Sequence, residues 1–121
     1  MEINKKQFQK WIEALDSGEY SQGRSRLQSK EGYCCLGVAC KVLIPENKQI
    51  LNDNGWLEGG ILEAQDDAPE WLKDISDDFE LKTIYEYDQG VTIETMNDDM
   101  DMSFEEIATC LELVYIHKIL E

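Results

Sequence analysis

Hydrophobic residues recur at intervals of three and four near the start of the chain, which is the spacing of an amphipathic helix. The apolar positions of this segment are Phe8, Trp11, Ile12 and Leu15. Asn4 can cap the helix, and Gln7 stands three residues further on, as in a capping box. Gly18 provides a stop signal. The pattern predicts a helix over residues 5–17 with one buried face.

The same spacing appears near the end of the chain, directly after Ser103. Its apolar positions are Phe104, Ile107, Ala108, Leu111, Val114 and Tyr115. Ser103 and Glu106 form the Ser-x-x-Glu capping box. The negative charges of Glu105 and Glu106 in the first turn interact favourably with the positive end of the helix dipole. We therefore expect a second amphipathic helix here.

Two shorter apolar segments lie between these helices. Residues 33–44 are almost uniformly apolar, which indicates a buried helix, and Pro45 should end it. The pair Ala68-Pro69 marks the start of another helix, because proline fits the first helical turn. The apolar side of that helix consists of Trp71, Leu72 and Ile75.

Alternation over 79–87, with Thr83 on the mainly apolar side and Ile84 on the mainly charged side, predicts a strand, and residues 88–90 are a good turn. Residues 91–93 can return as a hairpin partner, or residues 92–97 can form a short helix; the local pattern allows both. Residues 19–32 are rich in glycine and serine and are expected to form an ordered loop. The expected fold is α+β: a mainly helical single domain with a small antiparallel β element.

Charge is distributed unevenly along the 121 residues. The chain holds 11 basic and 26 acidic residues, for a net charge of −15. Residues 1–60 carry eight of each, so residues 61–121 carry three basic and eighteen acidic residues and all of the excess. Such a chain disfavours direct contact with nucleic acid or an anionic membrane. It has no membrane-spanning or signal-peptide pattern, so we expect a cytoplasmic protein.

The acidic half is the strongest functional signal in the sequence. The candidate partner-binding carboxylates are Asp66, Asp67, Glu70, Asp74, Asp77, Asp78, Glu80, Asp98, Asp99, Asp101 and Glu105. Rows of carboxylates can imitate the phosphate path of DNA, which carries one charge per roughly 1.7 Å of axis. A protein with a basic nucleic-acid-binding surface could be occupied in this way. The alternative is an acidic face that only contacts solvent.

Residues 22–26 offer a second candidate site. Gln22, Arg24 and Arg26 could bind an anion through guanidinium groups and backbone amides, with Tyr20 and Tyr33 nearby. This alternative describes an oligomeric small-molecule binder that sequesters an anionic nucleotide signal. Pairing of the arginines with the acidic half of the same chain would explain them without a ligand.

The residues that carry enzyme chemistry do not form a recognisable constellation, so we expect no catalytic residues, no metal and no cofactor. The cysteines are Cys34, Cys35, Cys40 and Cys110. They lack the Cys-x-x-Cys spacing of zinc sites and are expected to be buried, reduced thiols. The single histidine, His117, lies near a helix end. Residues 97–108 fail the ligand positions of a calcium loop.

Three segments resemble the motifs of a family of small proteins of tailed phages and prophages. Residues 11–23 are similar to W-x-x-A-L-x-S-G-x-Y-x-Q-G, and residues 33–40 are similar to Y/F-C-C-L-G-V-x-C. Met96-Asn97-Asp98 and residues 103–108 resemble L-N-D followed by S-F-x-E-I-A. Residues 61–90 match no motif, and residues 99–102 replace a shorter glycine turn.

The resemblance implies a phage or prophage origin and favours the short helix at residues 92–97, but it carries no biochemistry. Together with the charge, it predicts a non-enzymatic acidic protein that inhibits a host nucleic-acid-handling or defence protein through residues 63–106 in the cytoplasm of the host cell. A homo-oligomer is compatible with this prediction.

Overall fold

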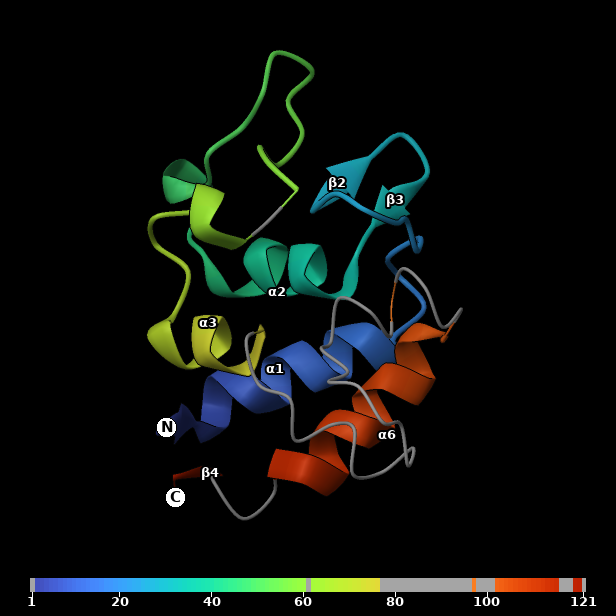
Figure 1. Ribbon diagram of the computed structural model, residues 1–121, viewed down its shortest axis with the longest axis vertical. Helices are drawn as coiled ribbons and strands as arrows, with labels where there is room; N and C mark the ends of the chain where they lie inside the picture. The colour runs from blue at the N-terminus through green and yellow to red at the C-terminus, as the bar shows by residue number, and fades with distance from the viewer. Residues whose placement is uncertain (1, 61, 77–96, 98–101, 116–118, 121) are drawn as a thin grey trace, which may run out of the picture.

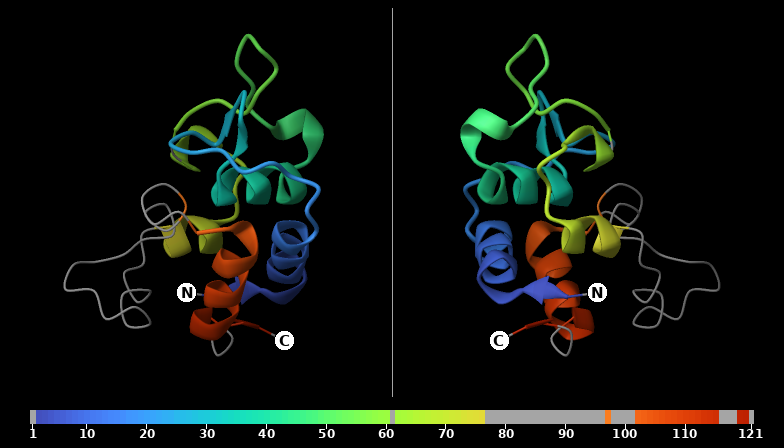
Figure 2. Two further views of the ribbon diagram at one scale, coloured as in Figure 1. Left: turned by 90° about the vertical axis from the view of Figure 1, so that its right-hand side faces the viewer. Right: turned by 90° about the vertical axis from the view of Figure 1, so that its left-hand side faces the viewer.

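The computed structural model describes residues 2–60, 62–76, 97, 102–115 and 119–120. Helix α1 (Lys5–Asp16) crosses the middle of the molecule, with α2 (Cys35–Leu43) on one side and α6 (Phe104–Tyr115) on the other (Figure 1). A quarter-turn separates these three helices more clearly (Figure 2). The expected α+β class, mainly helical with a small antiparallel β element, is confirmed.

The capping residues act largely as their sequence pattern indicates. The Oδ1 atom of Asn4 accepts a hydrogen bond from the backbone N–H of Gln7 at 2.9 Å. Ser103 and Glu106 form the complete capping box of α6, with bonds of 3.0 and 3.1 Å. The side chain of Gln7 does not complete the box of α1, because its Oε1 accepts from Nε1 of Trp71 at 2.7 Å. It therefore links α1 to α3 (Glu70–Ser76) instead.

The core is built where α1 meets the other helices. Phe8, Trp11 and Trp71 form an aromatic cluster with ring centroids 6.1 to 6.3 Å apart. The buried indole of Trp11 donates from Nε1 to the carbonyl oxygen of Cys35 at 3.0 Å. This bond satisfies the one polar group of a side chain that is otherwise buried among apolar neighbours, and it fixes the start of α2 against α1.

The β structure differs in place from the prediction. The antiparallel pair consists of β2 (Gln28–Ser29) and β3 (Gly32–Tyr33). It lies in the segment expected to be a loop, except for Tyr33, which was predicted to begin the next helix. A parallel pair joins β1 (Ile3–Asn4) to β4 (Ile119–Leu120), so the two ends of the chain lie side by side. The predicted strand at 79–87 and its hairpin partner lie outside the described residues.

The middle of the chain follows the prediction with one shift. Helix α2 ends at Leu43, before Pro45, as expected. Pro69 precedes α3 instead of standing within it, and its carbonyl oxygen accepts from the N–H groups of Leu72 and Lys73. Two short 3-10 helices, η1 (Glu46–Lys48) and η2 (Leu62–Ala64), connect these elements. No helix among the described residues is long and apolar enough to cross a membrane.

Candidate functional site

The three motif segments of the sequence meet at the side-chain amide of Asn97. Its Oδ1 accepts from Nε2 of Gln22 at 2.9 Å and from the backbone N–H of Cys35 at 3.3 Å. Its Nδ2 donates to the carbonyl oxygen of Gly23 at 2.9 Å. Asn97 is completely buried and helical, in agreement with the short-helix alternative at this position. Residues 92–96 lie outside the described residues. We call Gln22, Gly23, Cys35, Asn97 and Met102 the motif junction.

Glycines allow the backbone segments beside the motif junction to approach closely. A Cβ atom at Gly37 would lie 1.8 Å from the carbonyl oxygen of Leu27, and one at Gly32 would lie 2.1 Å from that of Ser21. No side chain fits at either distance. These close approaches explain the need for glycine two residues after the adjacent Cys34 and Cys35 and at the first residue of β3.

The motif junction changes the role of Gln22. This residue was predicted to bind an anion, but its Nε2 donates to Asn97 and, at 2.7 Å, to the carbonyl oxygen of Met102. Both amide hydrogens are thereby used inside the protein, so they are not offered to a ligand. Gln22 is a structural tie between the first and last motifs.

Arg24 and Arg26 lie on the surface on either side of Ser25, whose φ of 66° is in the left-handed region. A hollow of about 210 Å³ is lined by Gln22, Gly23, Arg24 and Glu31. This volume is below the roughly 300–1,000 Å³ of ordinary small-molecule pockets, and Glu31 adds a carboxylate where an anion would sit. The geometry gives little support to an anionic ligand at this loop.

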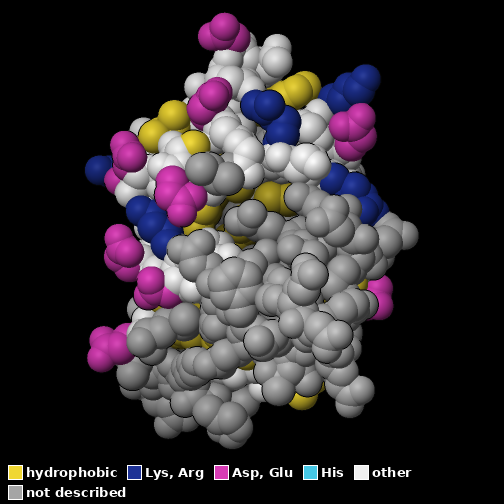
Figure 3. Space-filling model, viewed as in Figure 1, with side chains coloured by type: hydrophobic (Ala, Val, Ile, Leu, Met, Phe, Trp, Pro, Cys, Tyr) yellow, Lys and Arg dark blue, Asp and Glu magenta, His cyan; other side chains and the backbone are white. Residues whose placement is uncertain are grey.

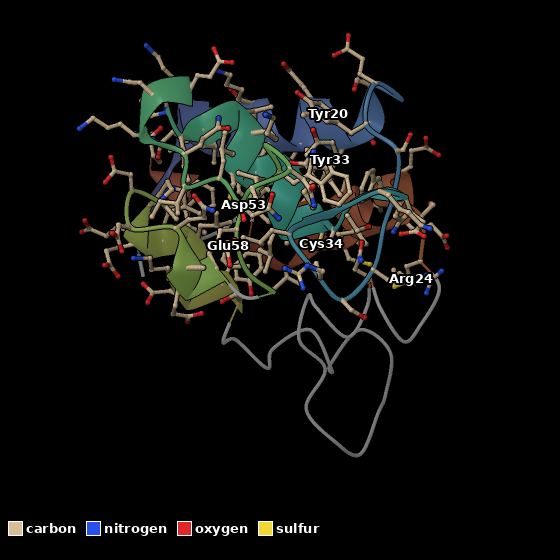
Figure 4. All side chains as sticks on the ribbon, turned by 90° about the horizontal axis from the view of Figure 1, so that it is seen from above. Tyr20, Arg24, Tyr33, Cys34, Asp53 and Glu58 are labelled. Carbon is tan, nitrogen blue, oxygen red and sulfur yellow. The ribbon has the colours of Figure 1, made fainter. Side chains whose placement is uncertain are left out.

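The two tyrosines expected near that loop pack on each other. The rings of Tyr20 and Tyr33 meet edge to face with centroids 5.5 Å apart, away from Arg24 (Figure 4). Burial raises the pKa of the Tyr33 hydroxyl, with a smaller contribution from Tyr20. Neither ring lines the hollow, so they do not form a stacking platform there.

The four cysteines are buried thiols that form no disulfide, as predicted. Burial raises the pKa of Cys40 to about 12, with a smaller contribution from Cys34, so this thiol is protonated at neutral pH. The Sγ atom of Cys34 accepts from the N–H of Gly37 at 3.4 Å and caps α2. All four thiols therefore pack in the core, and that of Cys34 also caps a helix. Within the described ranges no three His, Cys, Asp or Glu side chains are placed to hold a metal ion; His117 lies outside those ranges.

The structure places four of the predicted partner-binding carboxylates together, before and within α3. Asp66, Asp67, Glu70 and Asp74 are all exposed, and we call them the acidic row. Asp67 lies 3.8 Å from Nζ of Lys48, and Glu70 lies 3.9 Å from Nζ of Lys73. Figure 3 shows acidic side chains along this edge of the molecule with basic side chains between them, and further basic side chains on the side where β2 and β3 lie.

Glu105 does not join the acidic row. It is exposed in the first turn of α6, and that end of the helix lies across the molecule from α3 (Figure 1). Among the described residues, Glu105 and the acidic row therefore lie apart, because α6 runs with its N-terminal end away from α3. The remaining predicted carboxylates lie outside the described residues: Asp77, Asp78, Glu80, Asp98, Asp99 and Asp101.

A second buried amide, that of Gln65, was missed by the sequence analysis. Its Oε1 accepts from the N–H of Ile50 at 2.8 Å, and its Nε2 donates to the carbonyl oxygens of Ile50 at 2.8 Å and Glu58 at 3.2 Å. The side chain is completely buried. The turn-forming sequence Asn52-Asp53-Asn54-Gly55 was the available signal that the chain between these partners reverses direction.

A comparison with protein-family models shows which family the chain belongs to. It belongs to the family described as a domain of unknown function, DUF8296, whose model matches residues 3–115. The match spans all of the elements that build the motif junction and the acidic row. No curated protein and no solved structure matches the chain.

Proposed function

We propose that this protein is a non-enzymatic, acidic binding protein of phage or prophage origin that inhibits a host nucleic-acid-handling or defence protein in the host cytoplasm. The single observation that carries the proposal is the acidic row. It presents exposed carboxylates on a folded edge, and they belong to the half of the chain that holds all of the excess negative charge.

Lysines neutralise only part of this edge. Residues 62–76 contain five carboxylates and one lysine. The side chain of Glu70 is 85% exposed, so its ion pair with Lys73 gains little in water. The contact between Lys48 and Asp67 is also open to solvent. The edge therefore keeps a negative potential that a basic surface can recognise.

The spacing of the carboxylates suits a partner that reads phosphates. Glu70 and Asp74 stand one helical turn apart, about 6 Å along the axis at 1.5 Å per residue. One strand of DNA presents a phosphate about every 3.4 Å of axis, so this pair matches alternate phosphates. The buried residues between them, Trp71 and Leu72, hold the helix against the core. The backbone that carries these charges is thus held in place before a partner arrives.

The alternative function, an oligomeric binder that sequesters an anionic nucleotide signal, has weaker support. Its predicted site offers a small hollow, a tyrosine pair that faces elsewhere and a glutamine whose donors are already used. An anionic ligand would also approach a chain of net charge −15. A surface that binds protein agrees better with all four observations.

The phage or prophage origin depends on the resemblance of the three motif segments. Their convergence on Asn97 makes them one structural unit, which is the expected behaviour of motifs that define a family. Infection is a setting in which a small acidic inhibitor has an evident use. The property required of the host protein is a basic nucleic-acid-binding surface.

The proposal is tested by competition for DNA. A panel of purified bacterial DNA-binding proteins, including a restriction endonuclease, a repair nuclease and a nucleoid protein, is assayed for duplex binding with increasing amounts of this protein. We expect at least one member to be inhibited, more strongly at about 50 mM than at about 300 mM salt. The reason is that the distance over which charges interact, the Debye length, falls from about 14 Å to about 6 Å as the salt concentration rises.

Two variants that change net charge equally sharpen the test. The row variant, D66N/D67N/E70Q/D74N, and the control variant, E13Q/D16N/E19Q/E112Q, each remove four exposed carboxylates. We expect the row variant to lose most of its inhibition and the control variant to keep most of it. Equal loss of inhibition by the two variants would mean that only the total charge matters. If the unmodified protein inhibits no member of the panel, the proposal is wrong.

A further inference from the structure

Residues 50–58 form a projecting loop, which we call the finger, at one end of the molecule (Figures 1 and 2). Leu51 and Leu57 pair as an antiparallel bridge across it. The N–H of Asn52 donates to the carbonyl oxygen of Trp56, and the N–H of Glu58 donates to that of Ile50, both at 2.8 Å. The backbone of the finger therefore pairs with itself.

The tip and the base of the finger are both held in place. At the tip, Oδ1 of Asn52 accepts from the N–H groups of Asn54 and Trp56, and Gly55 takes a φ of 78°. At the base, Gln65 makes its three hydrogen bonds, and Leu57 is completely buried. A loop fixed in this way presents its side chains without a large ordering cost on binding.

The finger exposes two large apolar side chains at consecutive positions of the chain. Ile50 is 36% exposed and Leu51 is 46% exposed. In the described part of the chain, Leu113 on α6 is the one other large hydrophobic residue with comparable exposure. Single exposed apolar residues are normal, and the feature that sets this pair apart is its position on a fixed projection, where both side chains can reach into a partner.

Two acidic residues share the finger with this apolar pair, and the exposed Lys48 precedes it. Asp53 and Glu58 lie on the finger itself (Figure 4), and both are exposed. The acidic row is continuous with its base, because Gln65 binds the finger directly before Asp66, and Asp67 lies 3.8 Å from Lys48. The surface that complements this arrangement is an apolar recess bordered by lysine or arginine.

We propose that the finger is the anchor of the complex: Ile50 and Leu51 enter an apolar recess beside the basic groove of the same DNA-binding partner that the acidic row occupies. The inference rests on the proposed function and adds its second contact. A second copy of this chain is a poorer occupant, because pairing would bring together two chains that each carry a charge of −15. In such interfaces a few central apolar side chains commonly hold the complex, while charges at the rim attract it.

The test measures association and dissociation rates on the panel member that the protein inhibits. The finger variant I50S/L51S is compared with the row variant and with L113S, which removes an exposed leucine of α6. We expect the finger variant to dissociate about tenfold faster with an unchanged association rate, because an apolar contact acts after encounter. L113S should match the unmodified protein. Far-ultraviolet circular dichroism and thermal unfolding check that each variant folds.

The outcomes separate the finger from the acidic row. Slower association of the row variant with no effect of the finger variant overturns the anchor and leaves the proposed function standing. A finger effect with no row effect and no salt dependence overturns the acidic row, which is the observation that carries the proposed function, and the basic border of the recess. Sedimentation that shows a dimer dissolved by I50S/L51S would make a second copy the occupant. If no panel member binds, both proposals fail.

Discussion

Asn97 accepts a hydrogen bond from the backbone N–H of Cys35 at 3.3 Å, across 62 positions of the chain. The same amide oxygen accepts from Gln22, and the amide nitrogen donates to Gly23. One buried side chain thus connects the loop after α1, the first residue of α2 and the segment before α6. Because amides donate and accept at once, asparagine suits this position better than aspartate or leucine.

Replacing Asn97 with alanine should destabilise the protein severely. The change removes three hydrogen bonds at a site without solvent, and each buried group left without its partner costs about 1–3 kcal/mol. We expect Asn97→Ala to lower the free energy of unfolding by about 3–5 kcal/mol in urea titrations. Asn47→Ala, at an exposed position of η1, should change it by less than about 0.5 kcal/mol. A similar small effect at Asn97 would show that the motif junction does not stabilise the fold.

Gly37→Ala should be unusually costly for so small a change. The added Cβ would lie 1.8 Å from the carbonyl oxygen of Leu27, which is backbone and cannot rotate away. We expect a loss of about 3 kcal/mol or more, because overpacking forces the backbone to move. Gly18→Ala is the control: φ there is +76°, but no atom lies within 4 Å of the new Cβ, so about 1 kcal/mol is expected. Equal losses at the two glycines would contradict the close contact between α2 and Leu27.

Cys40 predicts how stability responds to alkaline pH. Its thiol has a pKa near 12 in the folded protein, against an ordinary 9.0. Between these values the unfolded chain releases the proton and the folded protein keeps it, so the free energy of unfolding should fall as pH rises from 9 towards 12, by at most about 1.4 kcal/mol per pH unit. The raised pKa of Tyr33 acts in the same direction.

Cys40→Ala isolates the contribution of this thiol. The variant starts from a lower stability, since it loses buried volume, but its decline between pH 9 and pH 12 should be shallower than that of the unmodified protein. Unfolding titrations at several pH values measure both slopes. Identical slopes would show that Cys40 ionises alike in the folded and unfolded states.

Gln65→Ala should loosen the finger selectively. The substitution removes the bonds that hold Ile50 and Glu58 at the base. Hydrogen exchange at the amides of Ile50 and Glu58 is expected to accelerate by about tenfold or more, beyond any change at Val38 inside α2. Gln9→Ala, at an exposed position of α1, should leave all three amides unchanged. Uniform acceleration at Val38 and the finger would instead mean that Gln65 supports the whole domain.

The helices were predictable because their signals are local. The apolar spacing of α1 and α6, the Ser103 cap and the uniform apolar run of α2 all appear within one element. Their bounds differ from the predicted ranges by one or two residues. The acidic row was also predictable, since its four carboxylates are close together in the sequence and charged side chains are normally exposed.

The contacts that the sequence could not reveal join distant segments. Gln7 looked like half of a capping box, but its side chain accepts from Trp71, 64 positions away. The parallel pairing of Ile3 with Ile119 and the two-residue strands β2 and β3 leave no alternating pattern to detect. The roles of Gln22 and Gln65 depend in the same way on partners that only the folded chain brings near.

The most direct measurement of the proposed function is the association rate of the row variant D66N/D67N/E70Q/D74N with the inhibited DNA-binding protein, at about 50 mM salt. The unmodified protein and the equally charged control E13Q/D16N/E19Q/E112Q should associate at similar, salt-sensitive rates, and the row variant should associate about tenfold more slowly or slower still. A row variant that associates as fast as the control would contradict the placement of the binding surface at the acidic row.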